Sequence, residues 1–171
     1  TPPPFHGSSI VGELIKSSKV INKKKIIYLS NNGSKSVSKV NSFEIFKILN
    51  PLKNYILLIT YLISKNITAI YLAPSINGKS FLRDFIYVVI GKIFKTKIIL
   101  HLHNKGVYNN SKRVHYRILY KYFFKGSYCM VLSEKLRYDL CNYVEDRMLY
   151  ICQNGLRDEN KGGEFKNQKE V

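Results

Sequence analysis

Five short runs of the chain are apolar and rich in β-branched residues, and they alternate with longer segments in which apolar residues recur every three to four positions. The runs are mostly continuous rather than alternating with polar residues, as in strands that are covered on both faces of a parallel sheet. The pattern therefore predicts an α/β fold with a doubly wound parallel sheet. The expected strands are residues 25–30, 67–72, 97–103, 128–132 and 148–152.

The segments between these runs predict helices. In one of them, apolar residues recur at Leu82, Ile86, Val89 or Ile90, and Ile93 with a period near 3.6, which is typical of a helix with one apolar face. In another, Pro51 should break or kink the helix because proline lacks the N–H that the preceding turn requires. The expected helices are residues 8–21, 42–66, 80–94, 112–125 and 133–143.

The two ends of the chain differ from its middle. Residues 157–171 have only Phe165 and Val171 as apolar residues, so a solvated tail or a truncated linker is expected there. At the other end, a turn over residues 2–7 leads directly into a helix, whereas a doubly wound sheet normally opens with a central strand. We therefore expect one Rossmann-like domain over residues 1–156 that lacks its first strand, cut from a longer polypeptide.

The charge of the chain is strongly positive, with 28 Lys and Arg against 11 Asp and Glu and a net charge of +17. Such a field attracts an acidic membrane surface, a phosphorylated substrate or nucleic acid, although codon bias toward Lys and Asn would produce the same composition. The longest apolar stretch, residues 55–63, is about half of the ~20 residues that span a bilayer. Three cysteines without metal-binding spacing indicate a reducing, cytoplasmic compartment.

Two loops carry residues that suit substrate chemistry. Gly7 and Ser8 open a helix whose first N–H groups and dipole attract an anion, although an ordinary turn with an N-cap accounts for the same residues.

His101 and His103 project to the same face of a strand, near the carboxyl end where open α/β sheets bind ligands. A His there can orient or deprotonate a substrate hydroxyl, and a purely structural His pair is the alternative. No Asp or His follows within the loop, so a metal site is not expected.

A rival motif lies between the second and third expected strands. Residues 73–80 end in Gly78-Lys79-Ser80 and satisfy a relaxed phosphate-loop pattern, so a nucleotide-binding protein is the alternative function. Ala73 replaces the usual first glycine, and Pro74 lacks one of the N–H groups that would hold phosphate. No later strand ends in an Asp suited to magnesium, which also counts against this function.

Taken together in order and spacing, five segments resemble the N-terminal half of family 4 glycosyltransferases, which have the two-domain GT-B architecture. The segments cover the chain up to Leu156, and each is weak by itself. They are Pro2-Pro-Pro-Phe-His-Gly7; Ser75-Ile-Asn-Gly78 with Phe81-Leu-Arg-Asp84; His101-Leu-His-Asn-Lys-Gly106; Val131-Leu-Ser-Glu134; and Ile151-Cys-Gln-Asn-Gly-Leu156.

The resemblance implies an enzyme of the hexosyltransferase type that moves a sugar from a nucleotide-sugar donor to an acceptor hydroxyl with retention of configuration, in cell-surface polysaccharide or glycolipid synthesis. In this family the N-terminal domain holds the acceptor and the C-terminal domain binds the nucleotide sugar. The family's pair of Glu residues, seven positions apart in the C-terminal domain, does not occur here, so this chain alone is expected to be inactive.

The resemblance also implies the partners and the location. The expected partners are a nucleotide sugar bound mainly by the absent C-terminal domain, a sugar or lipid-linked acceptor and an anionic membrane surface, with no cofactor, metal or nucleic acid. The expected location is cytoplasmic or peripheral on the inner face of the cell membrane. The segment 112–125 mixes basic and aromatic residues as an interfacial helix would, although a helix packed on the sheet with its cations in water has the same composition.

Residue by residue, the resemblance implies that His103 is the catalytic residue. Gly7 and Ser8 match a loop near the donor phosphates that usually reads Gly-Gly, and Asn154 matches the Asn that introduces the crossover to the second domain. The expected substrate-binding residues are Gly7, Ser8, Ser75, Arg83, Asp84, His101, Asn104, Lys105, Gly106, Ser133, Glu134 and Asn154.

Overall fold

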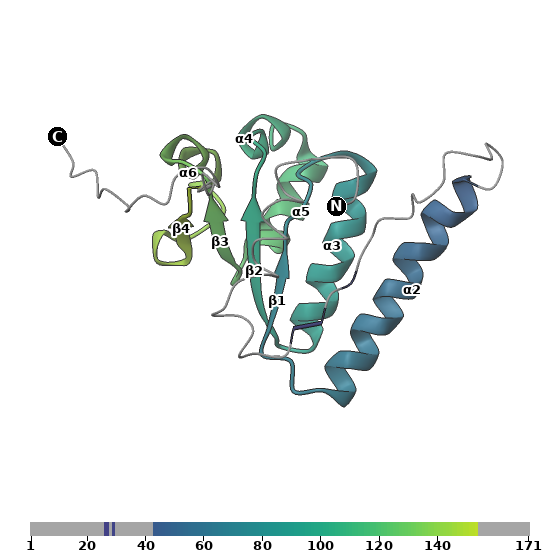
Figure 1. Ribbon diagram of the computed structural model, residues 1–171. Helices are drawn as coiled ribbons and strands as arrows, with labels where there is room; N and C mark the ends of the chain where they lie inside the picture. The colour runs from purple at the N-terminus through teal and green to yellow at the C-terminus, as the bar shows by residue number, and fades with distance from the viewer. Residues whose placement is uncertain (1–25, 28, 30–42, 154–171) are drawn as a thin grey trace, which may run out of the picture.

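The computed structural model describes residues 26–27, 29 and 43–153 of the chain, and within them an α/β fold with one parallel sheet (Figure 1). The strands lie in the order β1-β2-β3-β4 and every neighbouring pair is parallel. This arrangement confirms the predicted α/β, Rossmann-like fold. The strands are β1 (Ala69–Leu72), β2 (Lys97–Leu102), β3 (Tyr128–Val131) and β4 (Leu149–Ile151); the helices are α2 (Phe43–Ser64), α3 (Gly78–Ile93), α4 (Val107–Asn110), α5 (Val114–Phe124), α6 (Glu134–Leu140) and the 3-10 helix η1 (Asp146–Met148).

The core lies between the sheet and the helices α3, α5 and α6. Ile98, Leu100 and Leu102 alternate along β2, so they point to one face of the sheet, where they join the buried cluster formed by the three helices. Right-handed crossovers between successive neighbouring strands bring their helices to the same face. Aromatic rings fill this layer, and the ring centroid of Phe81 on α3 lies 5.2 Å from that of Phe123 on α5.

Gly91 lets α3 approach the sheet closely. A Cβ atom at this position would lie 2.8 Å from Cδ1 of Ile70 on β1 and 3.2 Å from Cδ1 of Ile98 on β2. Both distances are shorter than ordinary van der Waals contact, so any larger residue has to displace an isoleucine of the sheet. The glycine therefore sets the spacing between α3 and the two strands on either side of it.

The apolar face predicted for α3 is not the face that the sheet covers. Of the predicted positions, Leu82, Ile86 and Ile93 are 52%, 42% and 68% exposed and only Ile90 is buried; Phe81 and Tyr87, outside the predicted face, are also buried. The helix carries apolar residues on both sides, so its periodicity does not select one of them. Packing of the large aromatic rings selects the buried side, and an apolar stripe remains on the surface.

Two further expectations about secondary structure are not met where the structure can be described: a helix break at Pro51, and a strand at residues 26, 27 and 29. The helix α2 runs through Pro51 instead of breaking there, because packing beyond the proline, including the ring contact of Tyr55 with Tyr87, offsets its cost of about 3 kcal/mol. Ile26 and Ile27, from the strand expected at residues 25–30, are exposed and lie outside any strand. An apolar run does not supply the hydrogen-bonded neighbour that a strand requires.

Some expectations concern residues that the structure does not describe. Gly7, Ser8 and Asn154, the helix expected over residues 8–21 and the tail over residues 157–171 all lie outside the described residues. Within the described part of the chain, no helix combines the length and the apolar character that crossing a bilayer requires.

Candidate functional site

The parallel sheet gathers the loops that carry the candidate residues. Because all four strands run in the same direction, their carboxyl ends lie along one edge of the sheet, where ligands bind in open α/β folds. Of the expected site residues that the structure describes, those in the loops after the strands lie on this edge. They are Ser75 after β1; His103, Asn104, Lys105 and Gly106 after β2; and Ser133 and Glu134 after β3.

His101 and His103 form a contacting pair at the end of β2. Their ring centroids lie 4.2 Å apart, and His101 is only 2% exposed. The hydroxyl of Tyr71, on the neighbouring strand β1, lies 2.6 Å from Nδ1 of His101 and fixes the orientation of that ring. The Nε2 atoms of both imidazoles are buried, and neither has a hydrogen-bond partner among the described residues. Buried polar atoms of this kind are uncommon, and a bound ligand, ion or water is one way to satisfy them.

The surroundings of the two histidines keep them neutral. Burial lowers the pKa of both imidazoles below its ordinary value of 6.5, and the neighbouring His103 lowers the pKa of His101 further. Burial also raises the pKa of Tyr71 to about 12, so its hydroxyl keeps its proton. One ring nitrogen of a neutral imidazole carries a hydrogen and the other accepts one. The pair therefore has the protonation state that a base for a substrate hydroxyl needs near neutral pH.

Asp139 of α6 fixes the loop that follows His103. Its carboxylate accepts hydrogen bonds from the backbone N–H groups of Gly106, Val107 and Tyr108 at 2.7, 2.8 and 3.0 Å. Gly106 has a φ of 132°, which side chains rarely tolerate, so glycine is needed where the loop turns into α4. Asn104 and Lys105 are exposed between these fixed points and lie next to His103. Sequence reasoning missed Asp139, because nothing in its local sequence links it to a loop about thirty residues away.

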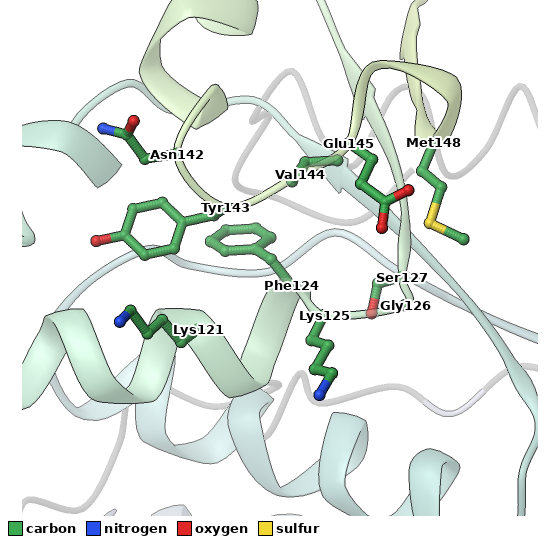
Figure 2. Close-up of a pocket in the computed structure, with 10 residues that line it drawn as sticks. All are labelled: Lys121, Phe124, Lys125, Gly126, Ser127, Asn142, Tyr143, Val144, Glu145 and Met148. Atoms are coloured by element: carbon green, nitrogen blue, oxygen red, sulfur yellow. The ribbon is translucent and has the colours of Figure 1, made fainter.

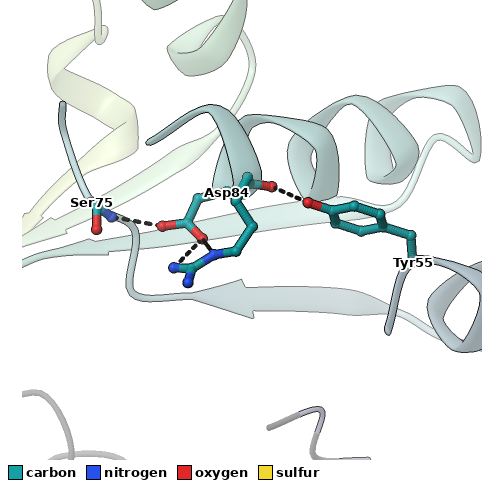
Figure 3. A network of polar contacts seen from close by, with 4 residues as sticks. Tyr55, Ser75 and Asp84 are labelled. Atoms are coloured by element: carbon teal, nitrogen blue, oxygen red, sulfur yellow. Dashed lines mark hydrogen bonds and ion pairs between the residues drawn. The ribbon is translucent and has the colours of Figure 1, made fainter. Parts of the chain in front are cut away.

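Arg83 and Asp84 form a polar network at the start of α3 (Figure 3). Asp84 is 1% exposed; one oxygen accepts the N–H of Ser75 at 2.8 Å, and the other pairs with the Arg83 guanidinium at 2.8 Å. Burial raises the pKa of Asp84, and the bonds from Ser75 and Arg83 oppose this effect. The Tyr55 hydroxyl donates to the Arg83 carbonyl at 3.0 Å. Asp84 thus holds the loop, while the partly exposed Arg83 keeps further N–H donors near the edge.

The same contacts bear on the phosphate-loop alternative. The N–H of Ser75 already donates to the carboxylate of Asp84, and the N–H of Gly78 donates to the Tyr116 hydroxyl at 2.8 Å. A phosphate-binding loop needs such amides for its anion, and a carboxylate at the same place repels a phosphate. These contacts therefore disfavour nucleotide binding at residues 73–80.

Ser133 and Glu134 lie at the start of α6 on the same edge. Ser133 occupies the N-cap position, but its hydroxyl makes no capping hydrogen bond. Glu134 is exposed and lies 3.7 Å from Arg137, one turn further along the helix. The Ser133 hydroxyl is therefore not used to cap α6, and it stays a candidate for contact with a substrate.

The structure also has a pocket on the opposite edge of the sheet. This pocket has a volume of about 370 Å³ and lies where Ser127 precedes β3 and Met148 precedes β4 (Figure 2). It is therefore at the amino ends of the strands, away from His103. Among the described residues, no group of three or more His, Cys, Asp or Glu side chains is placed to hold a metal ion.

Comparisons of the chain with protein-family models, with curated proteins and with solved structures give no match. Fold and site together define an α/β protein with a parallel sheet whose carboxyl edge carries a buried, neutral His pair. Because this fold supports many activities, the function has to be argued from the site itself.

Proposed function

We propose that this chain is the acceptor-binding, N-terminal domain of a nucleotide-sugar-dependent glycosyltransferase, with His103 as its catalytic residue. The observation that carries the proposal is the placement of His103 at the carboxyl end of β2 with a buried Nε2 atom that has no partner among the described residues. The ordered resemblance of five segments to family 4 glycosyltransferases supports the same function. The class of product would be a cell-surface polysaccharide or a glycolipid.

The chemistry requires a proton acceptor next to the acceptor hydroxyl. The acceptor oxygen forms a bond to the anomeric carbon of the donor sugar, while the bond from that carbon to the diphosphate oxygen breaks and the diphosphate leaves with the electron pair. The hydroxyl proton passes to the neutral imidazole of His103, whose pKa is lowered by burial. The contact of the His101 ring with His103 and the hydrogen bond between Tyr71 and His101 would hold the base in place.

The remaining candidate residues would bind the acceptor around this base. Arg83, Asn104 and Lys105 offer N–H donors to hydroxyl or phosphate groups along the same edge. The donor nucleotide would be bound mainly by a second domain, so the 171-residue chain by itself is expected to bind acceptor sugars without transferring a sugar.

Sugar binding by the chain tests the proposal directly. On an array of immobilised glycans, the chain is expected to bind a restricted set of sugars, and His103→Ala should weaken that binding. His115→Ala is the matched control, because His115 is exposed on α5 and lies outside the site. Equal loss in both variants, or no sugar binding at all, would contradict an acceptor site at His103.

Turnover gives the second test. In the complete enzyme, with its donor domain, His103→Ala is expected to lower turnover by ~10²-fold or more, as loss of general base catalysis does. His103→Ala should leave binding of the nucleotide sugar unchanged, since the donor occupies the other domain. Unchanged turnover in this variant would remove His103 from the proton transfer.

A further inference from the structure

Two pockets beside α5 share part of their lining and therefore form one groove, which we call the α5 groove. The pocket of about 370 Å³ described above and a second pocket of about 320 Å³ are both lined by Lys121, Asn142 and Tyr143 (Figure 2). The first pocket extends to Lys125, beyond one end of α5, and the second extends to Lys112, before the other end. The groove thus follows the whole of α5, whose 11 residues span about 16 Å.

The α5 groove is lined by four cations. Arg117, Lys121 and Lys125 recur every four residues, so they lie on one side of α5, and Lys112 precedes them. All four are exposed, and none forms an ion pair with an acidic side chain among the described residues. Of the described residues that line the two pockets, only Glu145 is acidic. Neighbouring cations without acidic partners repel one another, so the groove is suited to a ligand with several negative charges.

Aromatic and uncharged polar groups lie between these cations. Tyr108 on α4 is 55% exposed, and the Lys112 ammonium lies 5.9 Å from the centroid of its ring. The Tyr143 ring is held against Phe124, with the ring centroids 6.0 Å apart, while the side chain of Asn142 is exposed. A tyrosine ring offers a flat apolar surface for the C–H face of a sugar, and an amide both donates to and accepts from hydroxyl groups. The lining therefore suits a carbohydrate that also carries negative charge.

The α5 groove begins next to the proposed acceptor site. The helix α4 starts at Val107, directly after Gly106 in the loop that Asp139 fixes beside His103. Tyr108, the second residue of this helix, lines the groove. A sugar chain whose end lies at His103 can therefore continue over α4 into the groove.

We infer that the α5 groove binds an acidic glycan, a sugar chain with repeated carboxylates, as the extended part of the acceptor. The inference rests on the proposed function, because the acceptor end of the chain is the part that lies at His103. The lysines pair with carboxylates as point charges, and the Arg117 guanidinium offers two parallel N–H donors to one carboxylate. Cations spread over about 16 Å suit a repeated charge better than one small anion. Nucleic acid also carries repeated charges, but the continuity with the acceptor site favours a glycan.

Isothermal titration calorimetry of the full chain with acidic oligosaccharides tests the inference. The probes are hexagalacturonate and a hyaluronan hexasaccharide, in which every sugar or every second sugar carries a carboxylate. At least one of them is expected to bind, and its methyl-esterified form should bind about tenfold more weakly or worse, because esterification removes only the charge.

Variants of the groove locate the binding. Lys121→Gln, in the part that the two pockets share, and Tyr108→Ala should each weaken binding of the acidic oligosaccharide by about threefold or more. The matched controls on α6, Lys135→Gln and Tyr138→Ala, should leave the affinity unchanged, because both residues are exposed and line neither pocket. Circular dichroism of each variant checks that the changes act on the groove and not on folding.

The outcomes separate this inference from the proposed function. Binding of neutral sugars that depends on His103, without a preference for carboxylates, would keep the acceptor site and overturn the acidic glycan. Binding of an acidic oligosaccharide that depends on Lys121 but not on His103 would keep the glycan site and remove its link to the acceptor.

Several further results would overturn the inference. They are no binding of either acidic probe, equal binding of the esterified forms, and equal weakening by the groove variants and the α6 controls. Tighter binding of single-stranded RNA that Lys121→Gln weakens would assign the groove to nucleic acid. Equally tight, Lys121-dependent binding of polyglutamate would show a site for any polyanion instead of a glycan site.

Discussion

Replacing Asp139 with alanine removes the acceptor of three backbone hydrogen bonds at once. Val107, the middle donor, is 1% exposed, so its N–H cannot turn to water and costs about 1–3 kcal/mol when it is left without a partner. The N–H groups of Gly106 and Tyr108 are partly buried and lose roughly 1 kcal/mol each. The expected loss in the free energy of unfolding is therefore about 3–5 kcal/mol.

Urea unfolding followed by circular dichroism measures this loss. For a chain of this size, about 3–5 kcal/mol corresponds to a decrease in melting temperature of roughly 6–20 °C. Asp146→Ala is the control, because Asp146 pairs with Arg137 at 3.1 Å on the surface, and an exposed pair of this kind contributes about 1 kcal/mol at most. Asp139→Asn should fall between the two, since one carboxylate oxygen accepts two of the three bonds and the amide replaces only one of the oxygens by a donor.

Hydrogen exchange locates the effect. In Asp139→Ala, the amides of Gly106, Val107 and Tyr108 should exchange faster than in the wild type, while those of the β2 strand change less. If Asp139→Ala is no more destabilising than Asp146→Ala, or if the Val107 amide keeps its protection, then Asp139 does not hold the loop after His103. Because Asp139 acts through this loop, Asp139→Ala should also lower sugar binding by the chain, although Asp139 does not contact the sugar.

Three further outcomes follow from the structure. Burial lowers the pKa of His101 and His103 below 6.5, so below that pH the unfolded chain takes up protons that the folded chain does not. The free energy of unfolding should therefore be at its full value above about pH 6.5 and should fall as the pH drops from there toward the lowered pKa values of the two histidines. Urea midpoints at several pH values check this, and a Gln in place of either histidine should flatten the decline. Gly91→Val should destabilise the fold by about 1–3 kcal/mol, because its side chain meets Ile70, and an unchanged melting temperature would contradict the close approach of α3. Tyr71→Phe removes the bond to His101 and should cost about 1 kcal/mol, with a change in the titration of the His101 ring in NMR spectra; an unaltered titration curve would refute the contact.

The sequence predicted the fold class correctly because the relevant signals are local. Four of the five apolar runs form parallel strands, and the helices between them appear within a few residues of their expected bounds. The placement of Ser75, His103 and Ser133 on one edge follows from the same pattern, since parallel strands end together. The strand expected at residues 25–30 shows the limit of prediction from local sequence. A strand forms only when a second strand pairs with it, and the residues of the run do not specify that partner.

Other features were beyond local reasoning because they depend on partners far along the chain. The stripe from Leu82 to Ile93 has the period of a buried helical face, yet the sheet packs against Phe81 and Tyr87 instead. Asp139 and Tyr71 support the His103 region from elements about thirty residues away, so no motif around them indicates that role.

The sequence by itself thus determined the order of strands and helices, the positive charge and the position of His103 after a strand, because these depend on residues close together in the chain. Only the tertiary structure decided which face of α3 is buried, which carboxylates hold the loops and how the two imidazoles are surrounded. The physical reason is that burial and hydrogen bonding are properties of pairs: a side chain becomes core, support or surface only when the fold brings a second group against it.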